Sequence, residues 1–415
     1  MSTDVEDAVA RAAADGYGRL VAWLASRCRD LQLAEDCVGD ALEAALRKWP
    51  ESGIPANPEA WLLTAARRKL IDARRRAATR SEYASRERAP SDAVSSLQLE
   101  AHEAATAAFR ETLPDRRLEL LFLCAHPDID PSIRTPLMLQ TVLGVKAERI
   151  AGAMLVKPAT MGQRLSRAKR KLAEQNLPLS LPEPEALPKR TAFVLDAIYA
   201  AFGTAWFEGR EAGLVSEAIW LARLVVERLP ESAEALGLYS LMLHCEARRD
   251  ARIDSKGAFV PLEAQDTKRW DTTLILEAEK ALWLAARFQR PGAYQLEASI
   301  QSHHAHRARG GSTNWDAIHH LYGVLVRLYP SLGAFIGRAA SFGRMGRAAE
   351  GLALLDGLEE GRTQLYQPYW AVRAHLLREL QRDAEAKGAY EKAAGLATGP
   401  VVTWLLRQAS ALAGD

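Results

Sequence analysis

Residues 146–172, KAERIAGAMLVKPATMGQRLSRAKRKL, place the tightest constraint on how this chain folds. Apolar side chains recur at helical spacing in two runs, Ala147, Ile150, Ala151 and Met154, and then Met161, Leu165, Ala168 and Leu172. Pro158 precedes the second run, and a helix tolerates proline in its first turn because an N–H there has no intrahelical partner. The pattern predicts two short helices joined by a tight turn.

The face of the second predicted helix that points away from this apolar seam is polar and basic. It carries Thr160, Gln163, Arg164, Arg167, Arg170 and Lys171. No acidic residue lies between Glu148 and Glu174. Arginine and glutamine suit the edges of bases, whereas lysine and further arginines suit phosphates. We therefore predict a helix-turn-helix whose second helix enters a major groove; the alternative is a solvated surface helix that happens to be basic.

The N-terminal part of the chain also has a helical pattern. We expect a helix over residues 9–28 with Tyr17, Leu20, Val21 and Leu24 inward, and a second over 33–49. The second has one apolar stripe, formed by Ala34, Val38, Ala41, Leu42, Ala45, Leu46 and Trp49. Its opposite face is acidic and carries Glu35, Asp36, Asp40 and Glu43.

A third helix is predicted after a stretch broken by Pro50, Gly53, Pro55 and Pro58. It starts near Asn57, a good N-cap, and Trp61, Leu62, Ala65, Leu70 and Ala73 can pack inward. Its cations are Arg67, Arg68, Lys69, Arg74, Arg75, Arg76 and Arg80. One such charge run is often only a solvated face. Two basic helices, at 61–80 and 158–171, favour nucleic-acid binding, although the net charge of +2 adds no support.

Residues 81–100, SEYASRERAPSDAVSSLQLE, are typical of a flexible linker because they are rich in Ser, Arg and Glu. We expect the first domain over residues 1–80 and the second over 101–176. Two helices from LPDRRLELLFLCAHP and PSIRTPLMLQTVLG lead into the predicted helix-turn-helix.

This order of parts resembles the extracytoplasmic-function sigma factors of bacterial RNA polymerase, members of the sigma-70 family. The stretches DLQLAEDCVGDALEAALRKWP, PANPEAWLLTAARRKLIDARRR, LPDRRLELLFLC and ATMGQRLSRAKRKL carry the resemblance over residues 1–175. It implies two small helical domains on a flexible linker, with core RNA polymerase and promoter DNA as partners.

The resemblance also implies roles for individual residues. The acidic face at Glu35, Asp36, Asp40 and Glu43 would dock on core polymerase. The loop 50–58 and the helix 59–76 would open and read the −10 element, with Arg67, Arg68, Lys69, Arg74, Arg75 and Arg76 on the DNA backbone. Thr160, Gln163, Arg164, Arg167, Arg170 and Lys171 would contact the −35 element.

After a Pro-rich connector at 177–189, residues 190–415 form the third predicted domain. MGRAAEGLALL at 345–355 and LQRDAEAKGAY at 380–390 align at an offset of 35 residues, near the tetratricopeptide period. ALGLYSLMLHCEARRDARIDSKGAFVPLEAQDTKRWD resembles the tetratricopeptide-like extension of one sigma subgroup. Generic helical hairpins are the alternative. We expect an all-α chain whose extension regulates the sigma part. A contact between the extension and the sigma domains within the chain is one way in which it would do so.

Two features of this third domain have open interpretations. We interpret the polar stretch 247–271 as an internal ion-pair network, and a ligand or docking site is the alternative. The clustered histidines are His303, His304, His306, His319 and His320. Neighbouring histidines on a helix diverge, so we expect surface positions and no metal site.

Composition limits the remaining classes. The four cysteines form no CxxC pair, so neither a zinc knuckle nor a disulfide framework is indicated. The start, MSTDVEDAV, lacks the apolar core of a signal peptide, and no apolar run reaches the length of a membrane span. Neither a Walker loop nor GxSxG occurs. We expect a cytoplasmic protein without catalytic residues or cofactors. Its rival functions are a polymerase-independent DNA-binding regulator with a helical-repeat sensor and an interaction scaffold.

Overall fold

The computed structural model of the chain describes residues 2–84, 115–154, 156–208 and 212–412. Over these residues the chain forms α-helices and short 3₁₀-helices and no β-strand, apart from an isolated bridge between Ile253 and Phe259. The predicted all-α fold class is therefore confirmed. Among the same residues, no helix combines the length and the apolar character that crossing a bilayer requires.

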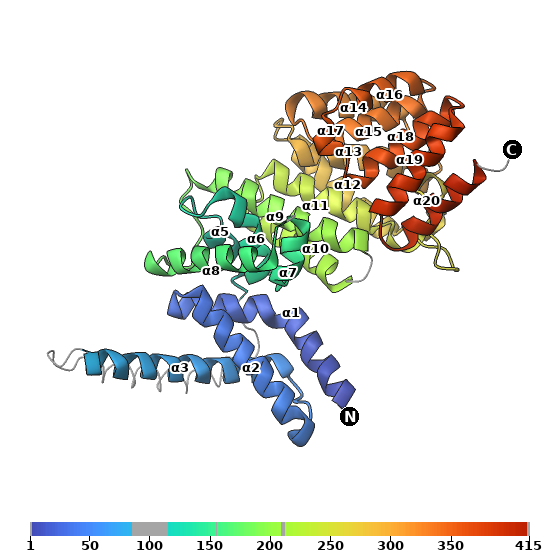
Figure 1. Cartoon of the computed structure of the whole chain (residues 1–415). Helices are drawn as coiled ribbons and strands as arrows, with labels where there is room; N and C mark the ends of the chain where they lie inside the picture. Colours follow the sequence, from blue (N-terminus) through green and yellow to red (C-terminus); the bar gives the residue numbers. More distant parts are fainter. Residues whose placement is uncertain (1, 85–114, 155, 209–211, 413–415) are drawn as a thin grey trace. The chain divides into compact units, whose positions relative to one another are not determined.

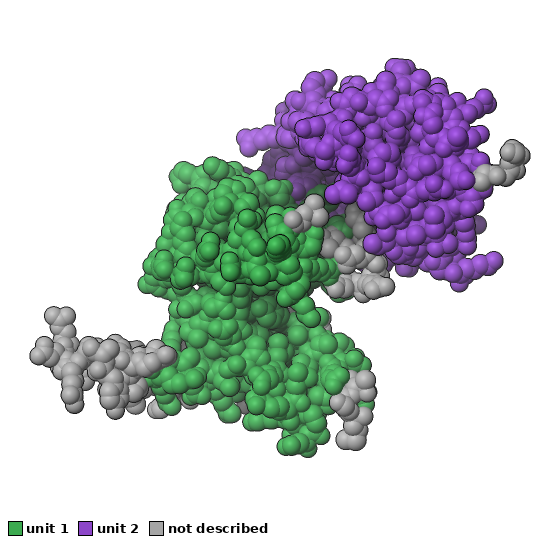
Figure 2. Space-filling model, in the orientation of Figure 1, with its two compact units in different colours: residues 1–203, 212–218 green, residues 204–211, 219–415 purple. Residues whose placement is uncertain are grey.

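The chain divides into two compact units (Figure 2). Unit 1 comprises residues 1–203 and 212–218, and unit 2 comprises residues 204–211 and 219–415. The helices of unit 1 are α1 (Ser2–Cys28), α2 (Leu31–Ser52), α3 (Pro58–Ala84), α5 (Arg117–Cys124), α6 (Pro131–Thr141), α7 (Ala147–Ala153) and α8 (Pro158–Glu174) (Figure 1). Helices α9 (Leu187–Glu208) and α10 (Ala212–Arg228) begin in unit 1 and end in unit 2.

Unit 2 continues as a series of helices. These are α11 (Ala233–Glu246), α12 (Thr272–Ala286), α13 (Ala293–Ala305), α14 (Trp315–Leu328), α15 (Leu332–Arg344), α16 (Ala348–Asp356), α17 (Glu360–Thr363), α18 (Gln367–Glu379), α19 (Asp383–Leu396) and α20 (Pro400–Ala411). Short 3₁₀-helices lie at Arg249–Ala251, Leu262–Ala264, Thr267–Arg269 and His306–Arg309. Helix α11 packs on α12 and α13. After α13 the packing runs along the chain, with α14 on α15, α15 on α16 and α18, α18 on α19, and α19 on α20.

The first three helices form close to where the sequence pattern predicts them, although α1 begins at Ser2 rather than at residue 9. In α1, Leu20, Val21 and Leu24 are fully buried. The Asp30 carboxylate caps α2 by accepting from the Leu33 N–H at 3.1 Å, and Asn57 caps α3 by accepting from the Ala60 N–H at 3.0 Å. These caps satisfy N–H groups that a helix end leaves without intrahelical partners.

Four predictions about helix ends and inward faces need correction. Helix α2 continues through Pro50 to Ser52, because a proline this near the C-terminus frees only the carbonyl one turn back. Leu46 is 44% exposed, at the edge of the apolar stripe. Met154 is 46% exposed because α7 ends just before it. Helix α3 reaches Ala84, past the start of the predicted linker 81–100, and the rest of that linker lies outside the described residues.

The predicted connector 177–189 lies within unit 1, and the boundary between the units falls later, in α9. The start of α9 is held to α5 and α6 by polar contacts. The Arg190 Nε donates to the Ala125 carbonyl at 3.4 Å, and the Arg134 guanidinium lies 4.4 Å from the centre of the Phe193 ring. The first part of the predicted extension thus belongs to the same compact unit as α5–α8.

Unit 2 contains a structural repeat at the offset of 35 that the sequence shows. Gly346 and Gln381 both adopt positive φ, +73° and +59°. The following N–H groups, of Arg347 and Arg382, each donate 2.9 Å back to a carbonyl of the preceding helix. Both arginines then pair through two hydrogen bonds with the glutamate three residues on, Glu350 and Glu385. The aligned residues therefore build the same helix–turn–helix corner twice.

The stretch 247–271 is held mainly by contacts to the main chain rather than by the predicted network of ion pairs. Arg252 donates to the Trp206 carbonyl at 2.8 Å, and Arg269 donates to the carbonyls of Asp250 and Ile253. The Asp254, Asp266 and Asp271 carboxylates accept from nearby backbone N–H groups. Ion pairs also join this stretch to other helices, Arg249 to Glu246 of α11 at 2.8 Å and Glu263 to Arg344 of α15 at 2.5 Å.

The prediction that the clustered histidines lie on the surface holds only in part. His306 and His320 are exposed, whereas His304 is buried, with its ring centre 5.3 Å from that of Trp315. Among the described residues, no group of three or more His, Cys, Asp or Glu side chains is placed to hold a metal ion.

Candidate nucleic-acid interface

Helix α8 separates an apolar seam from a basic face, as its sequence predicts. Met161, Leu165, Ala168 and Leu172 are all buried. The opposite face exposes Gln163, Arg164, Arg167, Arg170 and Lys171, and Thr160 is half-buried. Helix α7 packs against α8 from the other side of the turn, with Ile150 and Ala151 buried. The apolar seam thus packs α8 against its neighbours in unit 1, and the polar and basic side chains remain exposed on the opposite face of the helix.

Part of this basic face lines a groove of about 680 Å³ between α8 and the start of α6. Arg164, Arg167 and Lys171 contribute cations to it, and Asp128 and Asp130 contribute carboxylates. The Lys171 ammonium donates to the Asp128 carbonyl at 2.7 Å. Hydrogen bonds from Ser132, then the charge of Arg164, hold the pKa of Asp130 below its usual value. Because the Lys171 ammonium is already bound to the Asp128 carbonyl, Arg164 and Arg167 are more available to a phosphate or base than Lys171 is.

The cations of α3 lie along an exposed helix that Leu62, Ala66 and Leu70 anchor from their buried side. Arg68, Arg74, Arg75 and Arg76 are exposed, and Arg67 and Lys69 are half-buried. Ala65 and Ala73 are half-buried, so Ala66 is the inward alanine instead.

A further cation missed by the sequence analysis, Arg27 at the end of α1, joins this surface. Its guanidinium lies 3.4 Å from the centre of the Trp23 ring, and Arg74 donates to its carbonyl at 2.8 Å. Burial, then the charges of Arg67 and Arg116, lowers the pKa of Arg27 to about 10. Such crowding of like charges favours a bound anion.

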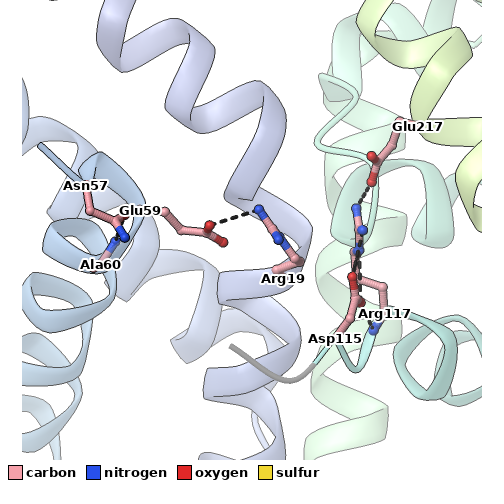
Figure 3. A network of polar contacts seen from close by, with 7 residues as sticks. All are labelled: Arg19, Asn57, Glu59, Ala60, Asp115, Arg117 and Glu217. Atoms are coloured by element: carbon pink, nitrogen blue, oxygen red, sulfur yellow. Dashed lines mark hydrogen bonds and ion pairs between the residues drawn. The ribbon is translucent and has the colours of Figure 1, made fainter. Parts of the chain in front are cut away.

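Two polar contacts hold the helices that carry these surfaces, and Figure 3 shows them. Arg19 of α1 donates to Glu59 of α3 at 2.9 Å, which fixes the start of the cationic helix. Arg117, at the start of α5, lies between the carboxylates of Asp115 and Glu217 and pairs with both. Its side chain is only 6% exposed, so both carboxylates are needed to offset the cost of burying the guanidinium.

The predicted acidic face of α2 is only partly free. Asp36, Asp40 and Glu43 are exposed, with Asp40 at 3.3 Å from the Lys69 ammonium and Glu43 at 3.6 Å from Arg47. Glu35 is different, because its side chain is 10% exposed and pairs with Lys169 of α8. In this structure Glu35 therefore does not share the open surface of the other three carboxylates.

Lys169 is a second residue that the sequence analysis missed. It lies at the edge of the apolar seam, next to Ala168 and one turn after Leu165, and its side chain is 4% exposed. A lysine at such a position needs a buried acceptor, and Glu35 beside Ala34 sits at the matching edge of α2. In both helices a charged residue at the edge of the apolar face could be seen in the sequence. That position alone did not identify Lys169 and Glu35 as partners.

Comparison with known proteins gives two domain matches. Residues 14–80 match the model of sigma-70 region 2, which covers most of α1–α3. Residues 190–286 match a family of unknown function, DUF6596, from α9 through α12. No solved structure matches the chain.

A whole-chain relative extends this result. An uncharacterized protein of Rhizobium meliloti (strain 1021) is 36% identical over 377 residues, which cover 89% of this chain and 87% of the relative. The matched sigma-70 domain acts in transcription initiation and is not enzymatic. The chain therefore belongs to one family with this Rhizobium meliloti protein, and it carries a sigma-70 region 2 ahead of a helical domain of unknown function.

Proposed function

We propose that the chain is a sigma factor of the extracytoplasmic-function type, which brings core RNA polymerase to promoters. The observation that carries the proposal is the match of residues 14–80 to sigma-70 region 2. Those residues include both the exposed carboxylates Asp36, Asp40 and Glu43 and the cations of α3. A docking surface and a DNA-binding surface on one small domain suit a protein that joins polymerase to DNA.

Each surface has a distinct role in this proposal. Asp36, Asp40 and Glu43 dock on polymerase, and Glu35 joins them only when it is released from Lys169. The α3 cations hold the opened −10 strand through its phosphates. The exposed Gln163, Arg164 and Arg167 of α8 read the −35 element in the major groove, with Arg170 and Lys171 on the flanking backbone.

The helical hairpins after residue 219 are the regulatory part of the proposal. The repeated corner at Arg347 and Arg382 supports a tetratricopeptide-like arrangement, in which stacked helix pairs present a surface to a peptide or a domain. No catalytic step is needed, because binding energy alone can favour melting of a few base pairs.

The proposal is tested by co-purification of the full chain with core RNA polymerase, followed by run-off transcription. We expect Asp36→Lys to reduce recovery of polymerase at least tenfold, since it reverses a charge on the exposed docking face. Glu391→Lys makes the same charge change on the exposed surface of α19 and should leave recovery unchanged.

Two results would contradict the proposal. Equal recovery of polymerase by the native chain, Asp36→Lys and Glu391→Lys would show that α2 is not the docking surface. Tight binding to duplex DNA without any association with polymerase would identify the chain as an independent DNA-binding regulator.

A further inference from the structure

The interior of unit 2 contains a stripe of polar side chains on one face of α11. Ser240, His244 and Arg248 follow one another at intervals of four residues, which places successive side chains one turn apart on the same face. The first two lie within α11, and Arg248 comes directly after its C-terminal cap, Ala247. Ser240 is fully buried and His244 is 1% exposed. Helix α11 packs on both α12 and α13, so this stripe belongs to a helical core.

The buried members of the stripe lack hydrogen-bond partners. Ser240 Oγ and both ring nitrogens of His244 are buried without one. Glu279 Oε1 lies 3.6 Å from His244 Nε2, too far for a hydrogen bond, and it accepts from Ser302 at 2.7 Å instead. His304 of α13 is 8% exposed, and its Nδ1 is also buried without a partner. Buried polar groups are almost always hydrogen-bonded, so this concentration of unpaired atoms points to a polar ligand.

Arg248 supplies a cation that has no carboxylate partner among the described residues. Its side chain is half-buried, and its hydrogen bond is to Cys245 Sγ at 3.7 Å, a weak acceptor. Burial lowers the pKa of this guanidinium. The neighbouring arginines are already engaged, because Arg307 donates to three main-chain carbonyls and Arg344 pairs with Glu263. A guanidinium withdrawn from water needs an anion, so Arg248 is the group that a negatively charged ligand would meet.

Arg248 lies close to both buried histidines. Ala247 and Ala305, which precede Arg248 and follow His304 in the chain, belong to one apolar cluster. Burial is the main cause that lowers the pKa of His244 and of His304, and among the charges that lower it further, that of Arg248 is the strongest for both rings. The guanidinium and the two rings therefore lie around one region between α11 and α13.

The chemistry of these groups fits a small organic acid. Two parallel N–H groups of a guanidinium match the two oxygens of a carboxylate, and one unpaired guanidinium matches one negative charge. Both rings are neutral near pH 7, because burial lowers each pKa to about 3, so each ring has one donor and one acceptor. The Glu279 carboxylate favours the proton of His244 on Nε2, which leaves Nδ1 as an acceptor for a hydroxyl group. Such buried groups reach only a small molecule.

We propose that the interior between α11 and α13 binds a small carboxylic acid that also carries a hydroxyl group. Arg248 holds the carboxylate, and Ser240, His244 and His304 bond to the rest of the molecule. The three α11 residues fall within residues 190–286, the match to the family of unknown function, so the site gives that region a ligand. It lies in unit 2, whereas the surfaces proposed for polymerase and DNA belong to unit 1.

The test is isothermal titration calorimetry of the full chain with sodium lactate at constant ionic strength. Sodium propionate has the same carbon skeleton without the hydroxyl group, and sodium chloride and sodium phosphate are the references. We expect saturable binding of lactate, with a dissociation constant about threefold or more below that of propionate. Arg248→Met should weaken lactate binding by about tenfold or more. Arg290→Met removes an exposed cation ahead of α13 and should leave binding unchanged.

A second variant separates a binding role from a structural one. Ser240→Ala removes a buried hydroxyl group that has no partner, so without ligand the variant should resist urea at least as well as the native chain. It should nonetheless bind lactate about threefold more weakly. Ser255→Ala makes the same change at an exposed position and should alter neither property.

Three results would contradict the proposal. Lactate heats no larger than those of chloride, or equal lactate binding by the native chain, Arg248→Met and Ser240→Ala, would overturn the site. Equal affinity for lactate and propionate would remove the hydroxyl contact from it. Saturable binding of phosphate in place of either acid would show that the ligand is not a carboxylate.

Discussion

At the scale of single residues, two buried histidines of unit 2 couple its folding to pH. His244 is 1% exposed and His304 is 8% exposed. Burial lowers the pKa of each ring to about 3, and neighbouring arginines, Arg248 above all, lower it further in both cases. The Glu279 carboxylate, 3.6 Å from His244 Nε2, does not outweigh burial. Both rings are therefore neutral in the folded chain at any pH near neutrality.

The first prediction concerns stability against pH. An unfolded histidine takes up a proton near pH 6.5, whereas these folded ones do so near 3, so stability is full above 6.5 and is lost as pH falls toward 3. Each ring should cost about 1.4 kcal/mol per pH unit in that window. Urea unfolding between pH 7.5 and 4.5 measures the slope. His304→Gln should lower that slope by about 1.4 kcal/mol per pH unit, because it removes one of the buried rings.

The second prediction concerns DNA recognition by Arg164. If Arg164 reads a base edge as proposed, Arg164→Ala should weaken binding to a cognate −35 duplex by about 1–3 kcal/mol. Arg223→Ala removes an exposed cation of α10 and should leave affinity unchanged. Fluorescence anisotropy at fixed salt gives both values. An equal loss on a scrambled duplex would reduce Arg164 to a phosphate contact.

At the scale of elements, helix ends in unit 2 are completed by side chains from other helices. Glu234 of α11 accepts from the backbone N–H groups of Tyr294 and Gln295 at 3.0 and 3.1 Å, in the first turn of α13. A carboxylate there also meets the positive end of the helix dipole. A Cβ on Gly292 would lie 2.1 Å from Glu234 Cδ, so this glycine leaves room for the cap.

The third prediction follows from this cap. Glu234→Ala leaves the two N–H groups of α13 without their acceptor and should cost about 1–3 kcal/mol of unfolding free energy. Glu391→Ala, at an exposed position of α19, should cost under about 0.5 kcal/mol. Urea titrations of the full chain compare them, and equal midpoints for the two variants would refute the capping role.

The elements differ in how far the sequence reveals them. The seam of α8 and most of the stripe of α2 could be read from spacing, because a helix puts residues three and four apart on one face. The cap of α13 by Glu234 and the pairing of Lys169 with Glu35 could not, because they join residues far apart in the chain. The continuation of α2 through Pro50 was missed because the breaking tendency of proline depends on its distance from the helix end.

At the scale of the whole molecule, the division into two units places the boundary within α9 rather than in the Pro-rich connector. The family match that begins at residue 190 therefore starts in the unit that also holds α5–α8. Residues Arg190 and Glu217 tie that part of the chain to Ala125 and Arg117. Composition suggested the connector, but only tertiary contacts show where a compact unit ends.

The fourth prediction is that the full chain unfolds in two steps. Separate compact units need not melt together, so a single two-state fit should fail. The step assigned to unit 2 should shift to lower urea as pH falls from 6.5 to 5, because His244 and His304 lie there. Hydrogen exchange read by mass spectrometry assigns each step to its unit. One transition, identical for both units at every pH, would contradict this prediction.

The duplicated corner at Gly346 and Gln381 has a consequence for how such chains diversify. Because both corners use the same backbone conformation and the same Arg–Glu clasp, excising residues 347–381 would join Gly346 directly to Arg382 and leave an intact corner. Gain or loss of a whole module at this site needs no new loop. Copy number can therefore change in a single genetic step that keeps this turn, provided that α19 then takes the place of α16 and α18 in packing on α15.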